Sequence, residues 1–290
     1  MNLEKIPLAE RAKLTSQWPV LLVGAQASGK TTAAENLPKE DKKRTILLNM
    51  DAKPVENSSD FAAVFTISSS RNILEEQIAK LSPEAKEYKD HYKKILASSY
   101  FLDDPESIDR LVGHITKATF SPNIDRVIID NFKQLDVFCE EWGQLNAPDS
   151  RAGWGLYGTS LQKVIQALKE CTTCGFKFTY LYGHHSIVAP QAYHNTFKKM
   201  PDVKGNIMKG EVESGFNTII YTYKDHEKDD TYFFESDVNN SMDTSRNKLV
   251  GTALKFERHS LDDIEQFLNN KKQIVDFQLV DSPAKETKKK

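Results

Sequence analysis

The stretch VLLVGAQASGKTT, residues 20–32, contains the pattern that decides the fold of this chain. An apolar run leads into Gly24, four further residues follow, and then come Gly29, Lys30 and Thr31 ahead of a helix-prone segment. A strand, a glycine-rich loop and a helix in this order form a phosphate-binding loop. Glycines let backbone N–H groups turn toward a phosphate, and the helix N-terminus attracts negative charge. The sequence therefore predicts a site for ATP with Mg²⁺, with GTP as the alternative nucleotide.

The polar residues of this region have separate expected roles. The Lys30 ammonium would contact the β- and γ-phosphates, and the Thr31 hydroxyl would ligate magnesium. Asp130 ends the apolar run RVIID, and a carboxylate at the end of a neighbouring strand would lie beside the loop and hold the same metal. The residues expected around the phosphates are Gly24, Ala25, Gln26, Ala27, Ser28, Gly29, Lys30, Thr31 and Thr32.

The group that would orient an attacking water is harder to identify. Such a carboxylate is often found just past the strand that follows the loop helix. Here that strand runs into NMDAKPVE, residues 49–56, with Lys53 at the expected position, so Asp51 and Glu56 are the candidate bases. Slow hydrolysis, or a switch that mainly binds ATP, therefore stays open. His184 and His185 end a later strand; one of them is a candidate γ-phosphate sensor, with a structural histidine as an equal alternative.

Short β-rich runs alternate with helix-prone stretches, which favours an α/β fold with a mostly parallel central sheet covered by helices on both faces. Two runs, 218–223 and 231–235, flank a polar loop and predict an antiparallel hairpin at the sheet edge. Asp104 is a candidate helix N-cap, and Trp154 and Tyr157 are expected to pack a helix start against the sheet. The other strands are expected at 19–23, 45–50, 62–67, 126–130 and 176–182.

The composition is that of an ordinary globular protein. The 290 residues are 39% hydrophobic and carry a formal net charge of −2, so any basic surface for nucleic acid must be local. Neither a signal peptide nor a bilayer-spanning segment is visible, which predicts a cytoplasmic protein without a membrane partner. The three cysteines are too few for a disulfide framework, and Cys171 and Cys174 are expected to be small side chains near a helix end.

The order of these motifs resembles that of a known family. A P-loop at Gly24, DAKP at Asp51, IIDNF at Ile128 and a strand ending at Gly183 are similar to the RecA-core P-loop ATPases of phages, described as AAA-type single-strand annealing or recombination ATPases. The resemblance covers residues 18–255. The resemblance implies a RecA-like strand order. For a phage-encoded protein it also implies that the protein is located in the cytoplasm of the host cell. Lys53 departs from the pattern and puts strand exchange in doubt, which favours annealing or DNA-dependent ATP binding.

The resemblance also implies partners. Family members contact single-stranded DNA with the segment after the sensor strand, which here is residues 186–210. This segment contains four lysines and one acidic residue, so its local charge is +3. It further implies a homo-oligomer with ATP between subunits, in which Arg246 or Lys248 reaches the neighbour's nucleotide, and a single-strand-binding protein is a further candidate partner. The expected DNA-binding residues are Tyr193, Phe197, Lys198, Lys199, Lys204 and Lys209.

We expect one principal domain with short appendages. These are an N-terminal extension at 1–17, an ATPase core at 18–258 with a helical insertion at about 71–120, a C-terminal helix and strand at 259–281, and a disordered basic tail at 282–290.

Three functions fit these features to different degrees. The leading hypothesis is an ATP-dependent single-stranded DNA-binding protein that assists recombination or annealing. A nucleotide-gated replication or recombination accessory protein with little hydrolysis is the second, with the charged stretch at 75–99 as its partner surface. A small-molecule kinase is the weakest, because no acceptor site with a base and lid arginines is visible.

Overall fold

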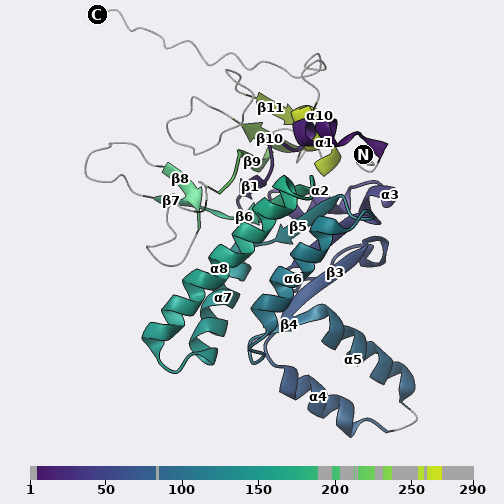
Figure 1. The fold of residues 1–290 in the computed structure, drawn as a ribbon, viewed down its shortest axis with the longest axis vertical. Coiled ribbons are helices and arrows are strands. Elements are labelled where there is room, and N and C mark those ends of the chain that lie inside the picture. The colour runs from purple at the N-terminus through teal and green to yellow at the C-terminus, as the bar shows by residue number, and fades with distance from the viewer. Residues whose placement is uncertain are drawn as a thin grey trace, which may run out of the picture.

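A nine-stranded sheet forms the centre of the computed structural model, which describes residues 5–82, 85–188, 198–202, 212, 215–225, 231–236, 254–257 and 260–269 (Figure 1). The strand order is β11-β10-β9-β1-β6-β5-β2-β3-β4. The seven strands from β9 to β4 are parallel, and β10 and β11 are antiparallel at one edge. Their bounds are β1 Val20–Gly24, β2 Thr45–Asn49, β3 Ala63–Ser68, β4 Ser99–Phe101, β5 Arg126–Asp130, β6 Phe178–Gly183, β9 Thr218–Asp225, β10 Thr231–Ser236 and β11 Leu254–Glu257.

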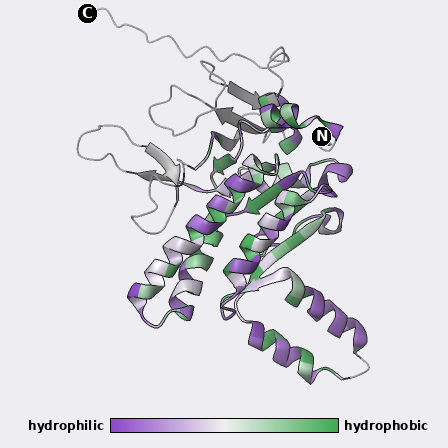
Figure 2. Cartoon of the chain, in the orientation of Figure 1, coloured by the Kyte–Doolittle hydropathy of each residue, from purple (hydrophilic) through white to green (hydrophobic). Residues whose placement is uncertain are grey.

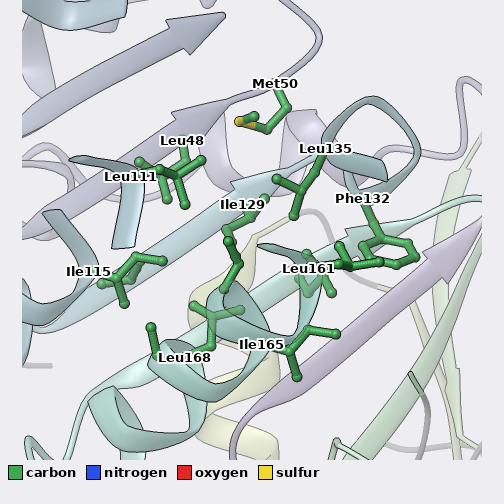
Figure 3. Packing of buried hydrophobic residues seen from close by; sticks show 14 of the residues in the cluster. Leu48, Met50, Leu111, Ile115, Ile129, Phe132, Leu135, Leu161, Ile165 and Leu168 are labelled. Atoms are coloured by element: carbon green, nitrogen blue, oxygen red, sulfur yellow. The ribbon is translucent and has the colours of Figure 1, made fainter. Parts of the chain in front are cut away.

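Helices cover both faces of this sheet. Successive strand residues point to opposite faces, so Leu21 and Val23 of β1 pack in one cluster while Val20 and Leu22 pack in the other. Figure 3 shows part of the first cluster, in which side chains of α6, α7 and α8 lie against β2 and β5. The second cluster includes residues of α2 and α10. The helices are α1 Leu8–Leu14, α2 Lys30–Glu35, α3 Lys39–Lys42, α4 Arg71–Lys80, α5 Lys86–Ser98, α6 Ser107–Phe120, α7 Phe132–Asn146, α8 Ser150–Thr173 and α10 Leu261–Asn269, with a 3-10 turn at Ser58–Asp60.

The fold class expected from the sequence is confirmed. Strands lie where the continuously apolar runs predicted them, and the antiparallel pair lies at the expected edge, with β11 as an additional outer strand. The strand β9 of this pair is also a parallel neighbour of β1, so it belongs to the interior of the sheet. Short strands that the sequence did not predict are β4, β11, and β7 (His185–Val188) and β8 (Lys198–Pro201), which form a separate antiparallel pair.

Two local predictions were wrong. Helix α6 begins at Ser107 with Glu106 at its N-cap. Asp104 holds the turn before the helix, where its carboxylate accepts hydrogen bonds from the Glu106 N–H at 3.1 Å and from Arg110 of α6 at 2.9 Å. The Trp154 side chain is 47% exposed and does not pack against the sheet. Tyr157 is buried as expected, and its hydroxyl donates to Asp136 of α7 at 2.6 Å. Cys171 is buried and Cys174 is exposed at the end of α8, in agreement with the structural role predicted for them.

Helices α4 and α5 form a hairpin that projects from the end of the sheet near β3 and β4 (Figure 1). No residue of either helix is buried, and both are largely hydrophilic (Figure 2). The hairpin lies within the range predicted for a helical insertion, while the domain boundaries as a whole stay predictions. Within the described residues, no helix is long and apolar enough to cross a membrane. The tail at 282–290 lies outside the described residues.

Candidate functional site

A pocket of about 250 Å³ opens where four adjacent strands end. Its lining residues follow the carboxyl ends of β1, β2, β5 and β6, where parallel strands commonly place ligand-binding groups. The pocket therefore sits at the place that the sequence predicted for phosphates. It is lined by Gln26, Ala27, Ser28, Gly29, Lys30, Thr31, Thr32, Asp51, Lys53, Asp130, Asn131 and His184.

The loop between β1 and α2 has a shape that depends on its small residues. Gly29 adopts a left-handed backbone conformation with φ 86°, directly before the first residue of α2. A Cβ atom on Gly24 would lie 2.3 Å from the Thr222 carbonyl oxygen and 2.4 Å from the Ser28 hydroxyl oxygen. The Thr222 hydroxyl donates to the Ser28 carbonyl at 2.6 Å, which joins the loop to β9. Glycine at these two positions lets the backbone curl tightly around the start of the helix.

The Lys30 side chain lies inside the loop. Its ammonium donates to the carbonyl oxygens of Gly24 at 3.0 Å and Ala25 at 2.7 Å, and to the Ser28 hydroxyl at 3.2 Å. Gly24 and Ala25 thus contact the lysine although they do not line the pocket. Lys30 is only 6% exposed, and burial lowers its pKa to about 8. The negative charge of Asp130 raises the pKa and so offsets part of this decrease. A buried cation with exchangeable hydrogen-bond partners is suited to bind a phosphate oxygen in their place.

Thr31 and Asp130 meet at the bottom of the pocket. The Thr31 hydroxyl donates to the Asp130 carboxylate at 2.5 Å, and the Asp130–Asn131 peptide bond is cis. Burial raises the Asp130 pKa to about 6, while the hydrogen bond from Thr31 acts in the opposite direction. A hydroxyl and a carboxylate oxygen are hard ligands of the kind that Mg²⁺ accepts. These two side chains would hold a magnesium ion through the Thr31 hydroxyl and the Asp130 carboxylate.

Two residues after β2 bring a second pair of charges to the pocket. The Lys53 ammonium lies 2.8 Å from the Asp51 carboxylate, and this hydrogen bond raises the Lys53 pKa. The backbone here is held by Asn49, whose side-chain amide donates to the Lys53 carbonyl at 2.7 Å. The position that would carry a catalytic glutamate thus presents an ammonium group, with a carboxylate two residues earlier.

His184 follows β6 and also lines the pocket. Burial lowers its pKa, with a further decrease from the Lys30 charge, and both effects favour the neutral imidazole. Its carbonyl accepts a hydrogen bond from the Asp202 N–H at 2.8 Å, and Asp202 forms an ion pair with Lys133 of α7 at 2.9 Å. The β7–β8 pair is therefore tied at its base to the pocket and to α7.

The structure brings together only part of the predicted set. Asp51 and His184 line the pocket, whereas the Glu56 side chain is exposed outside it. For His185, Lys198 and Lys199 only the backbone is described, in β7 and β8. The remaining candidates lie outside the described residues: Tyr193, Phe197, Lys204, Lys209, Arg246 and Lys248.

Two pocket residues, Lys53 and Asn131, were not among the predicted site residues. Lys53 follows the same strand as Asp51, so the rule that pocket residues follow strand ends could have identified it. Asn131 is 1% exposed and caps α7 by accepting a hydrogen bond from the Gln134 N–H at 3.0 Å. Asn131 could have been identified from the sequence because it directly follows Asp130 at the end of the same strand.

The fold and the pocket define this protein as an α/β protein with a mainly parallel core sheet and a glycine-containing loop of the phosphate-binding pattern between β1 and α2. In this core β6 lies between β1, which leads into the loop, and β5, which ends in Asp130.

Comparison with protein-family models and with curated proteins finds no match. Among solved structures, the chain is similar to a KaiC-like protein from the hyperthermophilic archaeon Pyrococcus horikoshii OT3, with 14% identity and a TM-score of 0.35 over 82% of this chain and 83% of that chain. It is also similar to the RadB recombinase, with 15% identity and a TM-score of 0.37 over 74% of this chain and 79% of that chain.

Proposed function

We propose that this protein binds ATP with Mg²⁺, hydrolyses it slowly, and uses the nucleotide to control binding of single-stranded DNA in recombination or strand annealing. The observation that carries the nucleotide part is the convergence of a buried ammonium, Lys30, with the hydrogen-bonded pair Thr31 and Asp130 around one loop. Cation, metal ligands and loop are the three parts that phosphate binding requires, and separate elements supply them.

The pocket residues would divide the chemistry among them. Bound magnesium would supply charge neutralisation on the phosphates. Lys30 would exchange its bonds with the loop carbonyls for phosphate oxygens. In hydrolysis a water oxygen attacks the γ-phosphorus while the bond to the ADP oxygen breaks. Asp51, the lining carboxylate that is not bonded to Thr31, would take the proton of that water.

The DNA part of the proposal is supported by the connection between His184 and the β7–β8 pair. His184 lines the pocket, and its carbonyl holds Asp202 at the end of β8. A change at the γ-phosphate would reach the segment 186–210, whose lysines and rings suit a sequence-tolerant single-strand site. By this proposal a neighbouring copy supplies Arg246 or Lys248 to the nucleotide, which would couple hydrolysis to assembly.

A second candidate function is a nucleotide-gated accessory protein with little hydrolysis. Two observations favour it: an ammonium from Lys53 replaces a carboxylate in the pocket, and the α4–α5 hairpin projects without a buried residue. This function predicts ATP-dependent capture of a protein partner that persists without turnover, and loss of capture when the hairpin is removed.

The main experiment measures Mg²⁺-dependent ATP binding by calorimetry and ATP hydrolysis with and without single-stranded DNA. Lys30→Ala should abolish binding and any DNA stimulation, because the buried cation is lost. Lys43→Ala is the matched control, since Lys43 is exposed and paired with Glu40 on the surface. Binding and hydrolysis of GTP, measured in parallel, show whether the pocket prefers adenine or guanine nucleotides.

Separate outcomes address the separate parts of the proposal. If the folded wild-type protein binds neither ATP nor GTP with magnesium, the nucleotide function is wrong. If it binds ATP but single-stranded DNA changes neither affinity nor turnover at moderate salt, the DNA role is wrong and the accessory function gains support.

A further inference from the structure

We propose that Lys53 is a ligand of the terminal phosphate and lets this pocket distinguish a nucleoside triphosphate from a diphosphate. The inference rests on the proposed nucleotide function and assigns a further residue to it. Its basis is the ion pair of Lys53 with Asp51 inside the phosphate pocket, at the position where a carboxylate was expected.

The backbone under Lys53 is held firmly relative to the metal ligands. The Met50 N–H donates to the Asp130 carbonyl at 2.5 Å, which fixes the end of β2 against the end of β5. Ala52 then turns the chain with a left-handed φ of 53°, and Asn49 holds the Lys53 carbonyl at 2.7 Å. Side chains at 51 and 53 are thereby presented to the same pocket as Asp130.

The two partners of the ion pair differ in freedom. The Asp51 side chain is 14% exposed, whereas that of Lys53 is 63% exposed. A long side chain in water loses little when it changes partners, and an exposed ion pair holds it weakly. The ammonium of Lys53 is therefore free to leave Asp51 for a stronger anion that enters the pocket.

A terminal phosphate is such an anion. Lys30 is bonded deep in the loop to the carbonyls of Gly24 and Ala25, so it approaches the nucleotide from the β1 side. Lys53 approaches from the end of β2, as a second cation on a different element. A γ-phosphate adds negative charge that Lys53 can bind, whereas a diphosphate lacks this group and leaves Lys53 with Asp51.

The test compares the affinities for Mg-ADP and for a magnesium complex of a non-hydrolysable ATP analogue by calorimetry. Lys53→Met should weaken analogue binding by about tenfold or more, the usual effect of a lost charge-assisted hydrogen bond, and should change ADP binding by less than about twofold. Lys53→Arg should restore most of the preference. Lys39→Met is a close control, because Lys39 is 65% exposed and lies 3.0 Å from Asp60 outside the pocket.

A second variant separates a phosphate ligand from a mere partner of Asp51. Asp51→Asn releases the Lys53 ammonium, so analogue affinity should stay the same or rise, opposite in direction to Lys53→Met. If both variants weaken analogue binding alike, or if Lys53→Met changes both nucleotides equally or neither, the inference is overturned while the nucleotide function stands. If the folded wild type binds neither nucleotide, the proposed function fails and the inference falls with it.

Discussion

Lys30 and Asp130 carry opposite charges in one pocket, and burial shifts the pKa of each toward neutrality. The Lys30 pKa is lowered to about 8 and the Asp130 pKa is raised to about 6. Below pH 6 Asp130 takes up a proton and is lost as a metal ligand, and above pH 8 Lys30 loses its ammonium charge. We therefore predict that Mg-ADP affinity is highest between about pH 6 and pH 8 and falls on both sides.

Calorimetric titration from about pH 5 to 9.5 measures this profile, with circular dichroism to confirm that the protein stays folded. Lys30→Arg serves as a control for the alkaline side, because a guanidinium stays protonated over this range. That variant should lose affinity overall but keep it constant above pH 8. A flat wild-type profile would show that the two shifted groups do not govern binding.

Gly24 is the residue whose substitution should damage the pocket most directly. A methyl group there would lie 2.3 Å from the backbone oxygen of Thr222, which cannot move without disturbing β9. Gly24→Ala should therefore reduce nucleotide affinity by about tenfold or more, the equivalent of about 1.4 kcal/mol. Gly113→Ala in α6 is the matched control, since nothing lies within 4 Å of its added Cβ.

Thermal unfolding and nucleotide titration of both glycine variants decide this prediction. Gly113→Ala should leave affinity unchanged and raise stability by about 0.5–1 kcal/mol, because alanine favours a helix over glycine. Equal nucleotide affinity in Gly24→Ala and wild type would contradict the role assigned to the close approach between loop and β9.

Helix α10 is joined to the sheet by a buried ion pair. The Arg126 guanidinium donates two hydrogen bonds of 2.6 Å to the Glu265 carboxylate, which also accepts from the Tyr180 hydroxyl at 3.0 Å. Arg126 and Glu265 are 0% and 1% exposed, so neither can find water as a substitute partner. Removal of the Glu265 charge leaves the Arg126 guanidinium buried with only its ion pair to Asp41 at 3.1 Å, and this costs more than the pair contributes when intact.

We predict that Glu265→Gln lowers the free energy of unfolding by about 3 kcal/mol, the range for a broken buried pair. Denaturant unfolding measures it. Glu40→Gln provides the control, because Glu40 forms only an exposed pair with Lys43 and should change stability by less than about 0.5 kcal/mol. Equal stability of the two variants would mean that α10 contributes little to the cooperative fold.

The elements show how far local sequence patterns extend. Continuous apolar runs identified β1, β2, β5 and β6, because a strand buried on both faces has little room for polar residues. An apolar run also identified β3, although its residues are only half-buried. β4 has only three residues, and β7 and β8 form a separate two-stranded sheet away from the core sheet, so no apolar pattern marked them. The start of α6 was predicted too early, because Asp104 holds the turn before the helix, where its carboxylate accepts from the Glu106 N–H at 3.1 Å.

The sequence predicted those pocket residues that belong to a local motif or that end a strand beside it. Lys30 and Thr31 belong to one local pattern, whereas Asp130 is 99 residues away from Thr31 and required the expectation that neighbouring strand ends meet. Lys53 was missed as a pocket residue because its residue type contradicted the role expected at that position. Glu56 was chosen as a carboxylate close in sequence to the end of β2, and the path of the chain after β2 carries it away from the pocket.

Asp130 links the pocket to the stability of the entire chain, because its carboxylate is 5% exposed and lies at the carboxyl end of an interior strand. Its folded pKa of about 6 exceeds the ordinary value of 3.8, so its ionisation destabilises the fold increasingly as pH rises from about 4 to 6 and fully above that. Asp130→Asn should therefore stabilise the unliganded protein by about 1–3 kcal/mol at pH 8, from about 1.4 kcal/mol per pKa unit, and by little at pH 4. By the proposed function Mg-ADP raises the melting temperature of the wild type, and the same variant should lose that rise because the proposed metal ligand is gone. Denaturant unfolding at the two pH values tests the change in stability, and melting curves with and without Mg-ADP test the loss of nucleotide stabilisation. A variant that is less stable than the wild type at pH 8 would contradict the cost assigned to the buried charge.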